Sequence, residues 1–217
     1  MMRRRNMEMR GVLGSFYVAC EWIVRLALVN ILWVGFSLLG GVVLGIFPAT
    51  IAMFTITRKW IQGETDLPIF QRFWAVYRKE FIKSNVFGFI LVIIGAVLVT
   101  DIYIFYSLEG VFSQVLFYLF IAITFNYAIM LLYIFPIYVH YDLKLFQNFR
   151  YALIIGMSNP FHTFSMILCL VFVYFALEVA PASFLFLSVA PLSMMYMVIA
   201  HRIFLKIEQK KSEEKSG

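Results

Sequence analysis

Histidine and cysteine are the side chains that most readily bind metals or act as acids, bases and nucleophiles. His140, His162 and His201 have no second ligand-type residue at helical spacing, and Cys20 and Cys169 lie in apolar stretches without CxxC spacing. Zinc and redox sites require such spacings. We therefore interpret the histidines as interfacial side chains and the cysteines as packing residues, and we expect no metal and no cofactor.

The sequence also lacks the motifs of several large enzyme classes. It contains no GxxxxGK[ST] phosphate loop, no HExxH, no GxSxG, and no pair of carboxylates in the middle of an apolar stretch. Nucleotide hydrolysis, metal-assisted hydrolysis and acid–base catalysis depend on such arrangements. The sequence thus predicts a protein that is not an enzyme.

Polar residues inside the apolar stretches are few, and they are the remaining candidates for function. Glu21 and Arg25 are four residues apart and can pair on one helical face. They form either a pair at the membrane boundary or a polar contact to another helix. Asn30, Gln114 and Asn126 are the other convincing candidates. A pathway for ions or sugars would line several spans with such groups, so their scarcity disfavours an autonomous transporter.

The composition predicts that the elements carrying these residues lie in a membrane. Of 217 residues, 63% are hydrophobic and 14% are charged, whereas soluble domains have about 45–50% and about 25%. Uninterrupted apolar runs reach the roughly 20 residues that cross a bilayer. The net charge of +6 comes from basic residues at the two ends and in two internal segments. This distribution indicates membrane orientation and not nucleic-acid binding.

Four spans are clear in the sequence, and they form two hairpins. The spans cover residues 86–106, 111–137, 161–177 and 182–204. The links within the hairpins carry Glu109 and Glu178 but no lysine or arginine, whereas the segments before and between the hairpins are basic. The positive-inside rule then places the links outside and the basic segments inside, together with the N-terminal segment 1–10 and the tail 206–217.

Residues 11–57 must cross an even number of times if both chain ends are cytoplasmic. Two crossings with a turn at Gly40–Gly41 give six spans in three hairpins and keep every one of the 18 basic residues except Arg25 on the cytoplasmic side. The alternative is one tilted span at about 26–47 beside an interfacial helix, which gives five. The predicted fold is an all-α, polytopic transmembrane helical bundle, a single domain over residues 11–205.

The cytoplasmic segment 67–83 predicts an amphipathic helix in the headgroup layer. Its aromatic residues recur at spacings of three and four, while its basic residues lie largely on other faces. This aromatic face acts either as a membrane anchor or as a docking surface for another protein. It consists of Phe70, Phe73, Trp74, Tyr77 and Phe81. Part of the pattern, FQRF, returns as FQNF in the second cytoplasmic segment.

Small residues concentrate around the expected first turn. Gly35, Gly40, Gly41 and Gly45 form the densest glycine cluster of the chain, and small residues let membrane helices approach closely. We expect the tightest helix–helix contact here, made within this chain or with another.

Several motifs occur in a familiar order along nearly the whole chain. They are LVNILW at 28–33, GxxPAT at 45–50, RKW at 58–60, FWxxYRKEF at 73–81 and FRYAL at 149–153. Together they resemble the YesL-like family of small bacterial integral membrane proteins, a domain of unknown function. The resemblance implies the bacterial cytoplasmic membrane, and it identifies no catalytic residue. Genes of this family commonly lie beside carbohydrate ABC-transporter components and sugar-responsive regulators.

The resemblance and the missing motifs together predict a non-enzymatic membrane accessory protein associated with carbohydrate uptake or sugar sensing. Its partners would be the lipid bilayer and the permease of a carbohydrate ABC transporter or a membrane sensor, or further copies of this chain. The alternative is a small transporter or channel that works alone or as an oligomer.

Overall fold

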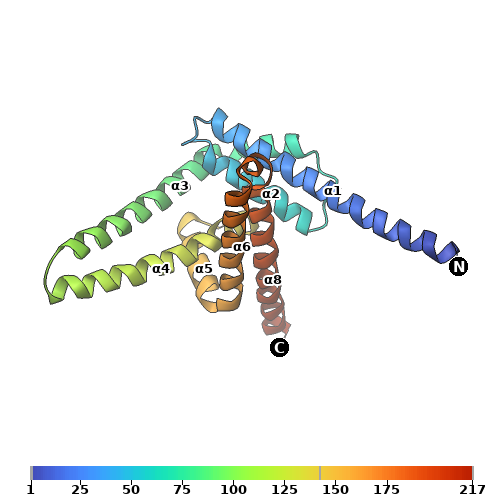
Figure 1. Ribbon diagram of the computed structural model, residues 1–217. Coiled ribbons are helices and arrows are strands. Elements are labelled where there is room, and N and C mark those ends of the chain that lie inside the picture. The colour runs from blue at the N-terminus through green and yellow to red at the C-terminus, as the bar shows by residue number, and fades with distance from the viewer. Residues whose placement is uncertain (1, 142, 217) are drawn as a thin grey trace.

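The computed structural model describes the backbone of residues 2–141 and 143–216, and the side chains from residue 14 onward except 142, 182, 187, 210–212 and 214–217. Every element in these residues is a helix (Figure 1). In chain order they are α1 (Met2–Leu39), α2 (Ile46–Ile61), α3 (Ile69–Ser107), α4 (Val111–His140), α5 (Leu145–Ser158), α6 (Pro160–Val179), η1 (Pro181–Ser183), α7 (Phe184–Leu187) and α8 (Val189–Ser216). The basic side chains of segment 1–10 and those of Lys210, Lys211 and Lys215 lie outside the described residues.

Five of the described helices are long and apolar enough to cross a membrane: α1 from Gly14, α3, α4, α6, and α8 as far as Gln209. This confirms the predicted all-α membrane bundle, because a helix satisfies its own backbone hydrogen bonds in lipid. The 16 residues of α2 rise about 24 Å, which is short of a hydrocarbon core of roughly 30 Å. The choice between six and five crossings therefore depends on α2.

The expected interfacial helix at 67–83 is not a separate element. It continues without a break into the expected span from residue 86, and the two form the single 39-residue helix α3. No glycine or proline interrupts the junction. There the side-chain amide of Asn85 donates to the carbonyl of Phe81, at 2.7 Å, and to that of Leu44 in the α1–α2 turn, at 2.9 Å. The junction between the two expected segments is thus helical and makes contacts through Asn85 that the charge pattern does not reveal.

The expected span at 182–204 also differs from the structure, because the helix is interrupted at Ser188. The short α7 ends before this residue, and α8 begins at Val189. Pro191 lies in the first turn of α8, where a missing N–H costs no helical hydrogen bond. The start of α8 is not recognisable from the sequence, because apolar residues lie on both sides of it.

The core forms around α2, which contacts α1, α3, α4 and α8. Met53 and Ile56 of α2 belong to the same buried cluster as Tyr133 and Ile137 of α4 and Phe204 of α8. Away from this cluster the helices diverge. The α3–α4 hairpin reaches to one side, the N-terminal part of α1 to the other, and α6 lies beside α8 (Figure 1).

Of the four glycines expected to make the tightest contact, Gly40 and Gly45 make a close approach. A Cβ on Gly40 would lie 2.4 Å from the Cα of Gly45, and a Cβ on Gly45 would lie 2.2 Å from the carbonyl oxygen of Ser37. Gly41 has a φ of +69°, which glycine adopts easily, and a Cβ there would meet nothing within 4 Å. Gly35 likewise has open space around it, so it makes no close contact within the described chain, and a contact with another chain stays a prediction.

Two close approaches involve glycines outside the predicted cluster. A Cβ on Gly88 of α3 would lie 2.2 Å from the ring of Phe47 in α2. A Cβ on Gly156 of α5 would lie 2.6 Å from Ile129 of α4. Neither glycine has a glycine neighbour in sequence, so glycine density did not reveal them.

Gly88→Ala should destabilise the protein, because the new methyl group would force Phe47 out of the α2–α3 interface. Overpacking of this kind costs about 1–3 kcal/mol. Thermal unfolding in detergent, followed by the loss of monodisperse protein, measures the effect. Gly35→Ala is the matched control, because it gives the same gain in helix propensity, up to about 1 kcal/mol, without a clash. Equal melting temperatures for the two variants would contradict the close approach.

Candidate functional site: a basic pocket between α2, α3 and α4

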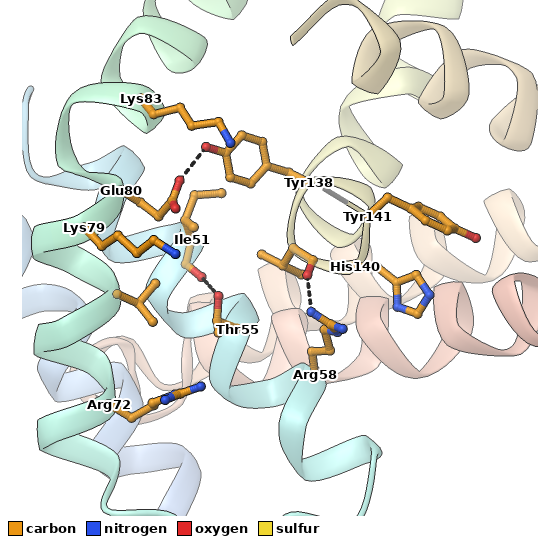
Figure 2. Close-up of a pocket in the computed structure, with 12 residues that line it drawn as sticks. Ile51, Thr55, Arg58, Arg72, Lys79, Glu80, Lys83, Tyr138, His140 and Tyr141 are labelled. Atoms are coloured by element: carbon orange, nitrogen blue, oxygen red, sulfur yellow. Dashed lines mark hydrogen bonds between the residues drawn. The ribbon is translucent and has the colours of Figure 1, made fainter. Parts of the chain in front are cut away.

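A pocket of about 390 Å³ lies where the C-terminal parts of α2 and α4 meet the N-terminal part of α3 (Figure 2). Its apolar wall comes from Ile51, Val76 and the backbone and side chain of Val139. The remaining lining residues are polar, aromatic or charged: Thr55, Arg58, Arg72, Lys79, Glu80, Lys83, Tyr138, His140 and Tyr141.

Four cations face one carboxylate around this pocket. Arg72, Lys79 and Lys83 are seven and four residues apart on α3, so they share one helical face. The fourth cation, Arg58, comes from the last turn of α2, where the negative end of the helix dipole favours positive charge. The pocket is therefore strongly cationic.

The side chains around Tyr138 are the most constrained part of the pocket. The Tyr138 hydroxyl donates to Glu80 Oε2 at 2.8 Å, and Lys83 Nζ lies 5.2 Å from the centre of the same ring. Glu80 and Lys83 thus reach from α3 toward α4 (Figure 2). This arrangement uses the single carboxylate of the pocket and fixes one wall.

Arg58 forms the second link between helices. Its Nη1 donates to the backbone carbonyl of Val139 in α4. Its buried Nε has no hydrogen-bond partner among the described residues. The side chains of Arg72 and Lys79 make no hydrogen bond or ion pair within the described part of the chain, and both point from α3 toward α2 (Figure 2). Part of the donor capacity of the pocket is therefore unused.

His140 and Tyr141 connect the pocket to α8. His140 Nε2 lies 3.3 Å from Glu208 Oε1. Burial, with the nearby Glu208 carboxylate as a further cause, raises the pKa of the Tyr141 phenol, so it stays neutral at physiological pH. The described residues contain no group of three His, Cys, Asp or Glu side chains that could hold a metal ion. The lining cations give the pocket the hydrogen-bond donors that an anion would require.

Two of the predicted intramembrane polar residues, Gln114 and Asn126, lie neither in the pocket nor together. Gln114 lies at the tip of the α3–α4 hairpin, beside Glu109. The amide of Asn126 donates to the carbonyl of Ala122 in its own helix, at 2.9 Å. These two side chains therefore line no shared path through the protein.

Glu21 and Arg25 pair as their spacing predicts, with 2.6 Å between Arg25 Nη2 and Glu21 Oε1. Arg25 also donates to the carbonyl of Thr65 at 2.9 Å and lies 3.9 Å from Asp66. The pair thus fastens α1 to the α2–α3 loop. This geometry fits a polar contact within the bundle.

Asn30 makes the densest set of polar contacts in the described chain. Its Nδ2 donates to the carbonyls of Phe184 and Leu185, at 3.0 and 2.9 Å. Its Oδ1 accepts from the backbone N–H groups of Val189 and Ala190, both at 3.0 Å. One side chain therefore caps the end of α7 and the start of α8, where backbone groups have no helical partner.

The predicted aromatic face of α3 is partly buried in the protein and partly exposed. Phe73 and Tyr77 are buried against Phe36 of α1, and the Tyr77 hydroxyl donates to the Phe36 carbonyl at 3.0 Å. Phe70 and Trp74 remain 59% and 46% exposed, and Phe81 is partly buried. Part of the face thus packs within the protein. Amphipathic spacing alone does not distinguish such packing from a membrane anchor.

Comparisons with known proteins identify relatives of unknown function. Residues 26–102 match the family described as "Protein of unknown function, DUF624". Three Bacillus subtilis proteins are similar over most of their length. The uncharacterized protein YteU is 36% identical over 94% of this chain and 91% of its own, YesL 34% over 91% and 93%, and YesV 34% over 91% and 95%. No solved structure matches.

Asn30→Ala should destabilise the packing of α7 and α8 on α1, because it leaves buried backbone N–H and carbonyl groups without partners. Each unsatisfied buried group costs about 1–3 kcal/mol. The melting temperature in detergent should fall clearly. Asn126→Ala is the matched control, because its exposed amide bonds only to its own helix within the described residues. A loss of stability in the control as large as in Asn30→Ala would disprove the capping role.

Proposed function

This chain belongs to the YesL-like DUF624 family of proteins of unknown function, and we propose that it is a non-enzymatic membrane accessory protein. In this proposal it contacts the permease of a carbohydrate ABC transporter or a membrane sugar sensor. The chain supplies helices to that assembly and performs no chemistry of its own.

The observation that carries the proposal is how little of the surface of some spanning helices is buried against the rest of the chain. Only 6% of the apolar stretch of α4 is buried, against 39% for α8. Large apolar side chains such as Val115, Leu119 and Phe125 are exposed along α4. Lipid can cover such a surface, and so can helices of another membrane protein, which associate by van der Waals packing.

The positions of the polar side chains support an accessory role over an autonomous transporter. Asn30 is occupied in capping two helix ends, Asn126 bonds within α4, and Gln114 lies at the hairpin tip. A solute path would need such groups along one continuous surface. Their separation favours a protein that acts through contacts.

The assignment to carbohydrate uptake comes from the setting that the family implies, with genes beside carbohydrate ABC-transporter components. This is an association and not a site in the protein. The proposal therefore needs a test that names the partner directly.

Affinity purification of the tagged chain in mild detergent should recover subunits of a carbohydrate permease, or a sugar sensor, in stoichiometric amounts. Leu119→Trp on α4 should weaken this recovery, because the larger side chain obstructs close helix packing on the hairpin. Leu168→Trp on α6 is the control, since both leucines are about equally exposed, at 50% and 51%, and α6 is packed against α8.

Purified protein reconstituted alone should leave vesicles impermeable to sugars and ions. Saturable solute flux through such vesicles, lost in an Asn126 variant, would replace the accessory role with a transporter. Failure of any transporter or sensor subunit to co-purify would remove the basis of the proposal.

We also propose that both chain ends are cytoplasmic, following the positive-inside rule. Reporter fusions at the two ends should then both give the cytoplasmic signal, as an even number of crossings requires. An external N-terminus with an internal C-terminus would show five crossings and would mean that α2 does not cross.

A further inference from the structure

The basic pocket between α2, α3 and α4 has more positive charge than the protein neutralises. It is lined by four cations, Arg58, Arg72, Lys79 and Lys83, and Glu80, the one lining carboxylate, accepts from Tyr138. The Glu64 carboxylate also interacts electrostatically with Arg58 and Arg72, but it lies outside the lining and forms an ion pair with Lys59. Like charges around a shared hollow repel, and the repulsion grows where the protein displaces water. An anion of suitable size in the pocket would remove this repulsion.

The donors around the pocket suit a phosphate group. The Arg58 guanidinium is held in place by the Val139 carbonyl and has an unpartnered Nε. An arginine fixed in this way donates to phosphate oxygens through a planar array of N–H groups. Lys79 and Arg72 project toward the same hollow from α3 (Figure 2) and add two exposed cations.

The position of the pocket along the helices indicates where that phosphate comes from. Within α3, Lys83 is the last basic residue, and the apolar part of the helix follows it. Within α4, the apolar run ends at Tyr138–Tyr141, beside the pocket. Tyrosines and basic residues at the ends of apolar runs mark the headgroup layer of a bilayer.

The opposite face of α3 also indicates that this part of the helix lies in the headgroup layer. A groove of about 510 Å³ there is lined by Trp74, Tyr77, Arg78, Phe81 and Ile82. Trp74 and Ile82 are exposed, as expected for side chains in contact with lipid. The same stretch of helix thus presents lipid-compatible side chains on one face and the cationic pocket on the other.

We propose that this pocket binds the phosphate of an anionic phospholipid headgroup. The phosphodiester lies among Arg58, Arg72 and Lys79, and the glycerol part lies against Ile51 and Val76. Basic pockets between membrane helices on the cytoplasmic side bind anionic headgroups in this manner. The assignment is independent of the accessory role, because the retained lipid is measured on the purified protein.

Native mass spectrometry of the protein in detergent, offered equal amounts of phosphatidylglycerol and phosphatidylcholine, tests the proposal. The wild-type protein should retain phosphatidylglycerol preferentially. The Arg72→Gln, Lys79→Gln double variant should retain it much less, by about fivefold for each charge removed. Lys79→Arg should behave as wild type, since the charge remains.

Arg78→Gln is the matched control for Arg72→Gln alone, because each removes one arginine charge and Arg78 lies on the opposite face of the same helix. Equal loss of phosphatidylglycerol in this control would show nonspecific surface attraction and overturn the proposal. If the double variant does not fold, Lys79→Gln alone, on an exposed side chain, carries the comparison.

A second arm separates lipid from free phosphate. Inorganic phosphate should protect the protein from heat weakly or not at all, whereas phosphatidylglycerol in the detergent should raise the melting temperature of wild type more than that of the double variant. Strong protection by inorganic phosphate with no preference between the two lipids would assign the pocket to a soluble phosphate compound and reject the lipid.

Discussion

The packing of α2 against four other helices is the constraint on which the rest of the structure depends. This helix buries Ala49, Met53 and Ile56 completely, although it is shorter than any of the candidate spans. Membrane helices gain little hydrophobic energy from packing on one another, so close contact matters most. The fits between Gly40 and Gly45 and between Gly88 and Phe47 bring α1 and α3 within reach of α2.

The second requirement is that each backbone group freed by a helix break finds a partner. The break between α7 and α8 leaves carbonyls and N–H groups at a depth where apolar side chains surround them, and Asn30 satisfies both ends. This explains why an amide stands within an apolar stretch of α1. Asn30, one of the few polar candidates in the apolar stretches, is thus occupied in holding the C-terminal part of the chain on α1.

Composition and charge were sufficient to predict an all-α membrane protein, because runs of apolar residues are long and basic residues cluster. The Glu21–Arg25 pair followed from spacing on one helix. What spacing could not show was any relation between helices. The pocket combines Arg58 of α2 with Lys79 of α3 and Tyr138 of α4, and the continuity of α3 depends on a contact between Asn85 and a turn 41 residues earlier. Such contacts exist only after the helices have packed.

The segment matched by the family, residues 26–102, coincides with this structural centre. It contains α2, the glycine turn before it and all four cations of the pocket. It also supplies polar connections to the later helices, because Asn30 caps α7 and α8, Arg58 holds the end of α4 at Val139, and Glu80 accepts from Tyr138 of α4. The remaining helices therefore attach to this segment at fixed points. The α3–α4 hairpin tip contributes no described side chain to the pocket or to the buried cluster, so this segment organises the centre of the fold without it.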